Sequence, residues 1–186
     1  NKPVKLITDS GNNIYAVGYF TDSINFDTGS GASWAEVDYG TYISKYDLNG
    51  EHVWGGAIDS LHVDNNISLT VDDSSLYVIN KAFSSIDADM SPSGQFLLPS
   101  SGTKDHVGIK YRLSTGEFEW AFRVGGNGMD EGGCVAVDDQ NIYVGGNFIG
   151  TMLNINLTDS NDYMASINGE SNVFLASYDK QDLTFN

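Results

Sequence analysis

Stretches in which apolar and polar residues alternate recur along the whole chain, and they come in groups of four. In the first group they are Lys5 to Asp9, Ile14 to Phe20, Tyr42 to Tyr46 and Val53 to Ile58. Alternation with a period of two is typical of β-strands that bury one face, and the β-branched and aromatic residues in these stretches favour strands. No segment has the pattern of a long amphipathic helix. The chain is therefore predicted to be all-β.

The group of four stretches is itself repeated, with a period of about 65 residues. Its landmarks are a tyrosine, a Lys-Tyr pair and a tryptophan: Tyr15, Tyr77 and Tyr143; Lys45-Tyr46, Lys110-Tyr111 and, with serine in place of lysine, Ser177-Tyr178; Trp54 and Trp120. Because the tryptophans and the first tyrosines recur in register, we interpret them as packing residues. Self-similarity at a fixed period indicates a repeat architecture.

Each repeat unit is predicted to hold four antiparallel strands. Leu48-Asn49-Gly50 and Ser114-Thr115-Gly116 separate the third strand from the fourth, and Asn-Gly between alternating strands is the strongest short-range hairpin signal. Four-stranded units repeated radially form a β-propeller. A β-solenoid or a β-sandwich could also use such strands, but the period is too long for a solenoid coil, and a sandwich would not repeat its aromatic positions.

We predict three propeller blades, at about 4–58, 67–124 and 133–186, of which the third breaks off within its fourth strand. Propellers typically use four to eight blades. Three blades alone would leave two large apolar blade faces in water. The chain is therefore expected to be part of a larger propeller, completed by more of the same chain or by a second chain.

The first unit contains a Phe26-Asp27-Thr28-Gly29 loop, the strand Tyr42 to Asp47, the turn Asn49-Gly50 and a strand with Trp54. This order resembles the bacterial β-propeller repeats often labelled SBBP. The second unit has Arg112 in place of the aspartate, and the third has no Asn-Gly turn. The resemblance implies a propeller in a secreted or cell-surface protein, with any signal peptide outside this segment. Its motifs build blades, so it implies a fold rather than an activity.

The composition agrees with this class and excludes several functions. The chain is 40% hydrophobic and 12% aromatic, which is enough for a packed core. Its net charge of −16, with only nine Lys and Arg residues, argues against binding to nucleic acid or to anionic membranes. No run of about 18 apolar residues is present, so no membrane insertion is predicted. The single cysteine, Cys134, excludes an intrachain disulfide.

Acidic residues are concentrated in two kinds of connection, those between second and third strands and those between blades. In a propeller these connections emerge on one face, which is the predicted binding surface, although acidic residues also serve solubility and turn formation. Of the 25 Asp and Glu residues these connections hold Asp22, Asp27, Glu36, Asp38, Asp59, Asp64, Asp87, Asp89, Asp105, Asp130, Glu131, Asp159, Asp162 and Glu170, against one cation, Lys104.

Two sets of residues on this face are candidates for binding. Calcium takes six to eight oxygen ligands, which dense aspartates can supply; the candidate ligands are Asp27, Asp38, Asp87 and Asp89, although no Asp-x-Asp-x-Asp-Gly loop is present. Aromatic residues in the loops could stack on a glycan or contact a protein, or could simply cap the loops. These residues are Trp34, Tyr39 and Tyr163.

Catalytic patterns are absent from the sequence. His52, His62 and His106 fall in different parts of the unit without metal-ligand spacing, and Arg112 and Arg123 are the only arginines. We therefore predict a non-catalytic extracellular module, used either for adhesion to a protein or glycan or as a structural scaffold. The alternative is a polysaccharide-acting propeller hydrolase or lyase whose active residues lie partly on blades outside this chain.

Overall fold

The computed structural model describes residues 2–27, 29–59, 61–62, 67–99, 104–157, 163–165 and 171–186. All regular secondary structure in this part of the chain is β-strand, and every pairing between named strands is antiparallel. The described residues contain no helix of the length and apolarity needed to cross a bilayer. The prediction of an all-β chain is confirmed.

The first sheet has the strand order β1-β2-β3-β4. Its strands are β1 (Lys2–Thr8), β2 (Ile14–Asn25), β3 (Trp34–Tyr46) and β4 (His52–Asp59). Gly50 closes the turn between β3 and β4 with a φ of 84°, a conformation that glycine adopts without strain. The Asn-Gly signal in the sequence therefore marks a real hairpin turn.

The second sheet is built around β6 (Ser68–Val71), β7 (Ser75–Ala82), β10 (Asp105–Arg112) and β11 (Phe118–Gly126). The short strand β5 (Leu61–His62) also pairs with β7, and β14 (Met152–Asn154) and β15 (Tyr163–Ala165) extend the sheet beyond β11. In the connection between β7 and β10, β8 (Ile86–Asp87) pairs with β9 (Leu97–Leu98).

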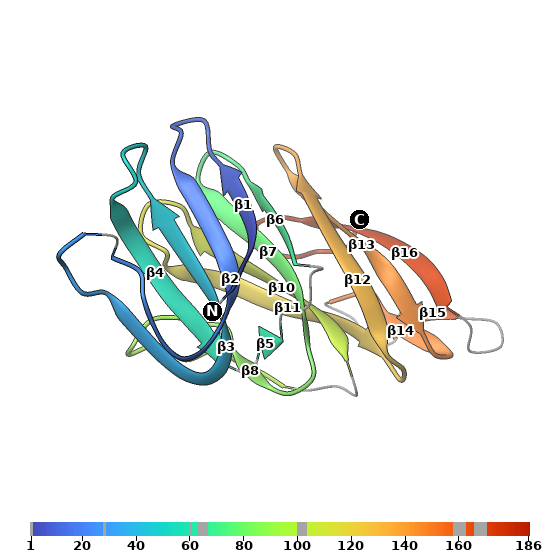
Figure 1. Cartoon of the computed structure of the whole chain (residues 1–186). Helices are drawn as coiled ribbons and strands as arrows, with labels where there is room; N and C mark the ends of the chain where they lie inside the picture. The colour runs from blue at the N-terminus through green and yellow to red at the C-terminus, as the bar shows by residue number, and fades with distance from the viewer. Residues whose placement is uncertain are drawn as a thin grey trace.

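The third sheet has the order β12-β13-β16. Its strands are β12 (Asp130–Val137), β13 (Asn141–Ile149) and β16 (Ser171–Asp179), and beyond β16 Phe185 forms a single antiparallel bridge to Tyr178. Figure 1 shows the three sheets following one another along the chain, from blue through green and yellow to red. Their assignment as blades of one propeller, with boundaries at about 4–58, 67–124 and 133–186, stays a prediction.

Two predicted connections are largely strand. β2 and β3 run on past a β-bulge at Phe20 and Asp22 and form a two-stranded ribbon over residues 22–25 and 34–37, inside the predicted connection 21–41. The connection predicted at 125–133 shrinks to three residues, because β11 ends at Gly126 and β12 begins at Asp130. Both expectations were wrong because acidic residues in these segments resemble a loop in sequence, whereas they occupy the outward positions or the covered ends of strands.

Apolar side chains between neighbouring sheets form the core. One buried cluster joins the first and second sheets, with members such as Val17, Ile43, Leu69, Val78 and Val107. A second joins the second and third sheets, with members such as Ile79, Phe122, Val144, Phe174 and Tyr178. The sheets are therefore held together mainly by burial of the apolar faces that their alternating sequences create.

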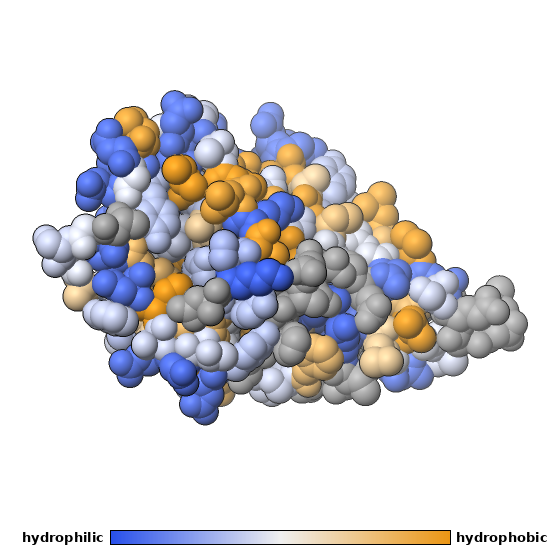
Figure 2. All heavy atoms as spheres, in the orientation of Figure 1, coloured by the Kyte–Doolittle hydropathy of each residue, from blue (hydrophilic) through white to orange (hydrophobic). Residues whose placement is uncertain are grey.

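The same repeat position is buried in the first sheet and exposed in the third. Ile43 and Leu175 each stand three residues before the repeated Tyr46 and Tyr178, and their side chains are 0% and 72% exposed. On the visible surface in Figure 2, apolar residues gather over β1 and over the third sheet. The faces at the two ends of the stack are thus less well covered than the junctions inside it.

We expect this difference to decide the effect of truncation. Ile43→Ala should lower the free energy of unfolding by about 2–5 kcal/mol, because it opens a cavity in the core between the sheets. Leu175→Ala, at the matching position, should change it by less than about 0.5 kcal/mol. Urea unfolding of both variants measures this, and equal losses would contradict the exposure of the third sheet.

Candidate functional site

An aspartate and a tyrosine form the same contact in all three sheets. The tyrosine hydroxyl donates to Oδ2 of the aspartate that follows the first strand: Tyr15 to Asp9 at 2.9 Å, Tyr77 to Asp72 at 2.8 Å and Tyr143 to Asp138 at 2.7 Å. Oδ1 of each aspartate accepts two backbone N–H groups of the next turn. The repeated aspartate and tyrosine therefore shape the first hairpin turn of each sheet.

The tyrosine, lysine and tryptophan of a unit lie in one row across three strands. Lys45 pairs in register with Tyr15 on one side and with Trp54 on the other. Lys110 pairs in the same way with Tyr77 and Trp120. This shared register explains why the three landmarks recur together in the sequence.

The lysine and the tryptophan of this row bind a backbone carbonyl of the next sheet. Lys45 Nζ and Trp54 Nε1 lie 2.9 and 3.0 Å from the carbonyl oxygen of Leu113. Lys110 Nζ and Trp120 Nε1 lie 3.4 and 3.2 Å from the carbonyl oxygen of Lys180. Leu113 and Lys180 occupy the same repeat position, two residues after Tyr111 and Tyr178. We call this pair of donors with its acceptor the lysine–tryptophan clamp.

Aromatic rings and a carboxylate compensate the charge of the clamp lysines. Lys45 Nζ lies 5.4 Å from the centroid of the Tyr15 ring, and Lys110 Nζ lies 5.6 Å from that of Tyr77. Lys110 also forms an ion pair of 3.0 Å with Glu119. Burying an ammonium group is costly unless such partners face it, and cation–π contacts supply part of the compensation.

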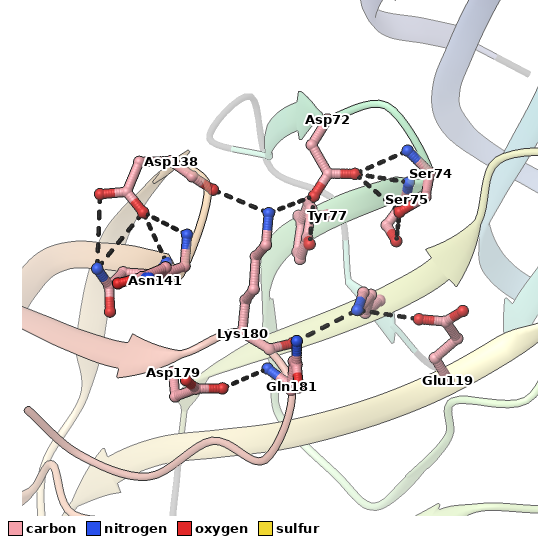
Figure 3. Close-up of polar contacts among 12 residues, drawn as sticks. Asp72, Ser74, Ser75, Tyr77, Glu119, Asp138, Asn141, Asp179, Lys180 and Gln181 are labelled. Carbon is pink, nitrogen blue, oxygen red and sulfur yellow. Dashed lines mark hydrogen bonds and ion pairs between the residues drawn. The ribbon is translucent and has the colours of Figure 1, made fainter.

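A further cation joins the second and third sheets (Figure 3). Lys180 Nζ lies 3.0 Å from Oδ2 of Asp72, in the second sheet, and 2.9 Å from the carbonyl oxygen of Asp138, in the third. Burial alone would raise the pKa of Asp72, but hydrogen bonds from Ser74, Lys180, Tyr77 and Ser75 outweigh it and lower this pKa to about 2. The carboxylate of Asp72 therefore keeps its charge at pH values well below those at which a free aspartate is protonated.

The second tyrosine of each unit ties the long connection to its sheet. Its hydroxyl donates to a backbone carbonyl 20 or 23 residues earlier in the same unit: Tyr46 to Phe26 at 3.0 Å, Tyr111 to Ala88 at 2.7 Å and Tyr178 to Ile155 at 2.6 Å. These contacts hold the segments that contain most of the predicted binding residues. Those segments are thus anchored at a repeated point.

Trp34 and two acidic residues share the exposed side of the ribbon. Trp34 is 61% exposed at the start of β3, and Glu36 and Asp38 are exposed at the alternate positions that follow. Ala35 and Val37, between them, pack against the cluster that contains Phe26. We call Trp34, Glu36 and Asp38 the ribbon face.

The other predicted aromatic residues lie elsewhere. Tyr39 is half-buried, with its ring 6.2 Å from that of Tyr19, so it does not share the exposure of Trp34. Tyr163 begins β15, where its backbone pairs with Asn154. Of the three predicted aromatic residues, Trp34 is therefore the one whose side chain the structure places on the surface.

The remaining aspartates predicted as metal ligands close backbone turns. Asp27 accepts the N–H of Gly29, Asp87 accepts those of Asp89 and Phe96, and Asp89 accepts that of Ser91. Among the described residues, no three His, Cys, Asp or Glu side chains gather into a group that could hold a metal ion. Calcium binding stays a prediction.

Two carboxylates assigned to the acidic surface are buried, which corrects that assignment. Asp105 forms an ion pair with Arg123, with Oδ2 and Nη1 3.0 Å apart, and both side chains are covered. Asp130 is fully buried and accepts the N–H of Gly126 at 3.2 Å. Burial raises the pKa of Asp130 to about 7, and the charge of Asp105 adds to this rise. Asp105 is the first residue of β10, and Asp130 is the first residue of β12.

The described histidine side chains act in packing. The ring of His52 stacks on Phe26, with centroids 5.7 Å apart, and the ring of His106 lies 5.3 Å from that of Phe174. Burial lowers the pKa of His106, so its ring is neutral at physiological pH. For His62 only the backbone, in β5, is described.

Sequence reasoning missed the clamp and the ion pair between Asp105 and Arg123. The clamp had a usable signal, because Lys45 and Lys110 recur in register with the tryptophans, and the lysine could have been assigned to the junction along with them. The ion pair had none, since Arg123 has no counterpart in the other units.

Comparison with known proteins finds a distant relative. The chain is 24% identical, over an alignment of 205 residues, to an uncharacterized WD repeat-containing protein of Acanthamoeba polyphaga mimivirus. The alignment covers 96% of this chain and 15% of that protein, so the chain spans a small part of the relative's length. No family model matches the chain, and no solved structure matches it. The resemblance to the SBBP repeats therefore stays a prediction.

The three tryptophans allow a direct test of the clamp. Trp54→Phe and Trp120→Phe keep a ring in place but remove the donor to the next sheet, so each should cost about 1–3 kcal/mol of unfolding free energy. Trp34→Phe, on the ribbon face, should cost less than about 0.5 kcal/mol. Chemical denaturation of the three variants gives the comparison, and an equal cost at all three positions would contradict a role of the clamp in stability.

The buried Asp130 should make stability depend on pH. Its pKa of about 7 in the folded chain lies above the usual value near 4 in an unfolded chain. Between these two values the native state keeps a proton that the unfolded state has lost, so stability should fall as the pH rises from about 4 to about 7.

Asp130→Asn should remove this fall. The free energy of unfolding of the variant, relative to that of the parent, should therefore be higher at pH 8 than at pH 5. Urea unfolding at both pH values measures the effect, with Asp38→Asn on the exposed ribbon as the control. An unchanged pH dependence in Asp130→Asn would show that another group titrates.

Proposed function

We propose that the chain is a non-catalytic part of a β-propeller-like repeat scaffold that binds a protein partner through the ribbon face. The observation that carries the proposal is that the repeated polar and aromatic residues of the chain have structural contacts, whereas the side chain of Trp34 has none of these among the described residues. The repeated ones make turns and junctions, as the aspartate–tyrosine pairs and the clamp do. Trp34, which is not repeated, is the tryptophan that stands exposed.

The comparison and the fold support the scaffold part of this proposal. The relative is described as a WD repeat-containing protein, and WD repeats form β-propellers of four-stranded units. The antiparallel sheets of this chain, repeated with the same landmarks, agree with that architecture. Propellers of this kind serve as platforms whose function lies in surface features rather than in the repeat itself.

The composition of the ribbon face favours a basic protein segment as its partner. An exposed tryptophan followed along its strand by two carboxylates offers an apolar anchor next to polar groups, which are the components of a binding hot spot. The net charge of −16 would attract Lys and Arg and repel acidic partners. An extracellular, adhesive role and recognition of a glycan rest on the resemblance and on Trp34 alone, so the observations favour a protein partner over them.

The structure offers less to the alternative of a polysaccharide hydrolase or lyase. An open hollow of about 460 Å³ over the β11–β14 edge of the second sheet is lined by Leu98, Pro99, Arg123, Gly125, Gly126, Asn127, Met152 and Asn154. Glycosidases need two carboxylates flanking the scissile bond. This lining supplies none. A second hollow, of about 400 Å³, contains Asp72, Asp73, Asp138 and Asp139, but Asp72 and Asp138 already accept hydrogen bonds from Tyr77 and Tyr143.

Arrays of peptides and of glycans, probed with the labelled chain, test the proposed function. We expect binding to Lys- and Arg-rich peptides that weakens with salt. Trp34→Ala should reduce it about tenfold or more, as loss of a hot-spot anchor does. Leu97→Ala, equally exposed but outside the ribbon, is the matched control. Binding to glycans alone, or binding that Trp34→Ala leaves unchanged, would overturn the protein-binding proposal.

A further inference from the structure

The first sheet has, at Leu48, the repeat position whose carbonyl accepts the clamp in the second and third sheets. Leu48 stands two residues after Tyr46, as Leu113 and Lys180 stand after their tyrosines. The carbonyl of Leu113 receives Lys45 and Trp54, and that of Lys180 receives Lys110 and Trp120. Both lysine–tryptophan pairs of the chain are thus already bound, one at the junction of the first and second sheets and one at the junction of the second and third.

Exposure on the first sheet agrees with a missing neighbour. The side chain of Leu48 is 65% exposed, whereas Leu113 at the matching position is 6% exposed beneath the first sheet. Leu6, three residues before Asp9, is 62% exposed, whereas Leu69, three residues before Asp72, is 6% exposed. Two apolar positions that a preceding sheet covers inside the stack are therefore open at this end.

The opposite end of the stack has a matching apolar surface but not the clamp donor. Val173 and Leu175 on β16 are 80% and 72% exposed, whereas Thr41 and Ile43 at the same positions of the first sheet are fully buried. The row that holds Lys45 and Lys110 continues in the third sheet with Ser177, opposite Tyr143. A serine side chain is several bonds shorter than lysine and brings no ammonium group to a carbonyl of the next sheet.

We propose that the uncovered face of the first sheet, marked by Leu6, Leu48 and the Leu48 carbonyl, is a docking surface for a further unit of the same repeat that carries the lysine and tryptophan of the clamp. The proposal rests on the scaffold part of the proposed function and deepens it by naming this partner. At two junctions inside this chain, the equivalent apolar positions are buried and the equivalent carbonyl is bound by a lysine and a tryptophan, and the first sheet offers the same features.

A second copy of this chain does not fit the surface equally well. Docked head to tail, it would offer its third sheet, with Ser177 in the lysine position, to the Leu48 carbonyl. The apolar contacts would form without the ammonium donor, and the loss of a hydrogen bond from a charged donor weakens such a junction roughly tenfold or more. The sequence of the third unit thus disfavours closure of the chain on its own copy.

The test adds one unit to the full chain. A duplicate of residues 2–64, placed directly before Lys2, brings a second copy of Lys45 and Trp54 to the original Leu48. We expect the extended chain to unfold in urea in one transition at a higher midpoint than the natural chain. A control carries Lys45→Ser and Trp54→Phe in the added copy only, and its folding equilibrium constant should fall by roughly tenfold or more.

Leu48→Ala gives an independent measure of coverage, because it leaves the clamp donors untouched. In the natural chain it should leave the urea midpoint almost unchanged, and in the extended chain it should lower the midpoint clearly. An added unit that unfolds separately, a control that matches the extended chain, or a Leu48→Ala effect of the same size in both chains would each overturn the proposal.

Sedimentation of the natural chain tests the competing occupant. We expect a monomer at every concentration examined, and a dimer disrupted by both Leu48→Asp and Leu175→Asp would assign the surface to a second copy and overturn the proposal.

Peptide binding at Trp34 has a separate readout. Loss of binding there with an intact added junction would refute the protein-binding function alone, and the reverse result would refute this inference alone.

Discussion

Two side chains from one sheet meet at a single backbone oxygen of the next sheet, and the arrangement of the stack depends on this convergence. Apolar burial supplies most of the attraction between sheets, but it has little directional preference. The donors at Leu113 and Lys180 have strict geometry, so they set the register in which each apolar face meets its neighbour. The tyrosine beneath each lysine contributes to both, since its ring faces the ammonium group and its hydroxyl holds the first turn.

The turn aspartates show how the units compensate for differences in their sequences. Asn13 follows Asp9 and donates to its carboxylate at 2.8 Å, and Asn141 stands at the same place near Asp138, at 3.5 Å. The second unit has Ser75 there, and Lys180 reaches across from the third sheet to supply the donor that Asp72 would otherwise lack. One local contact has become a contact between sheets.

The sequence allowed the strands and their repetition to be predicted because apolar alternation and spaced aromatic residues report burial directly. Tyr15, Tyr77 and Trp54 are buried, as their recurrence indicated, whereas Trp120 and Tyr143 at the matching positions are half-buried. It did not allow the ribbon to be predicted, since Glu36 and Asp38 alternate with small or branched residues in a stretch that also suits a loop. Nor did it indicate the burial of Asp105 and Asp130, because the cost of burying a carboxylate is offset by partners, such as Arg123, that only the fold brings near.

The candidate site was predicted in part. Trp34 lies exposed on the same side of β3 as Asp38, as a surface site requires, because both occupy outward positions of one strand. Tyr39, one residue later, lies on the other side of the strand with Ala35 and Val37, and its ring faces Tyr19. Turn geometry accounts for the hydrogen bonds of Asp27, Asp87 and Asp89 without any ligand.

The acceptor of the clamp is a main-chain oxygen, and this has an evolutionary consequence. Leucine and lysine both occupy the acceptor position, since any residue that keeps the turn presents the same carbonyl. The side chains that specify the junction therefore all belong to one of the two sheets that meet there. A duplicated or recombined unit that retains its lysine and tryptophan meets a competent acceptor at once, without a matching mutation in its neighbour, so arrays of such units can lengthen, shorten or exchange members by single genetic events.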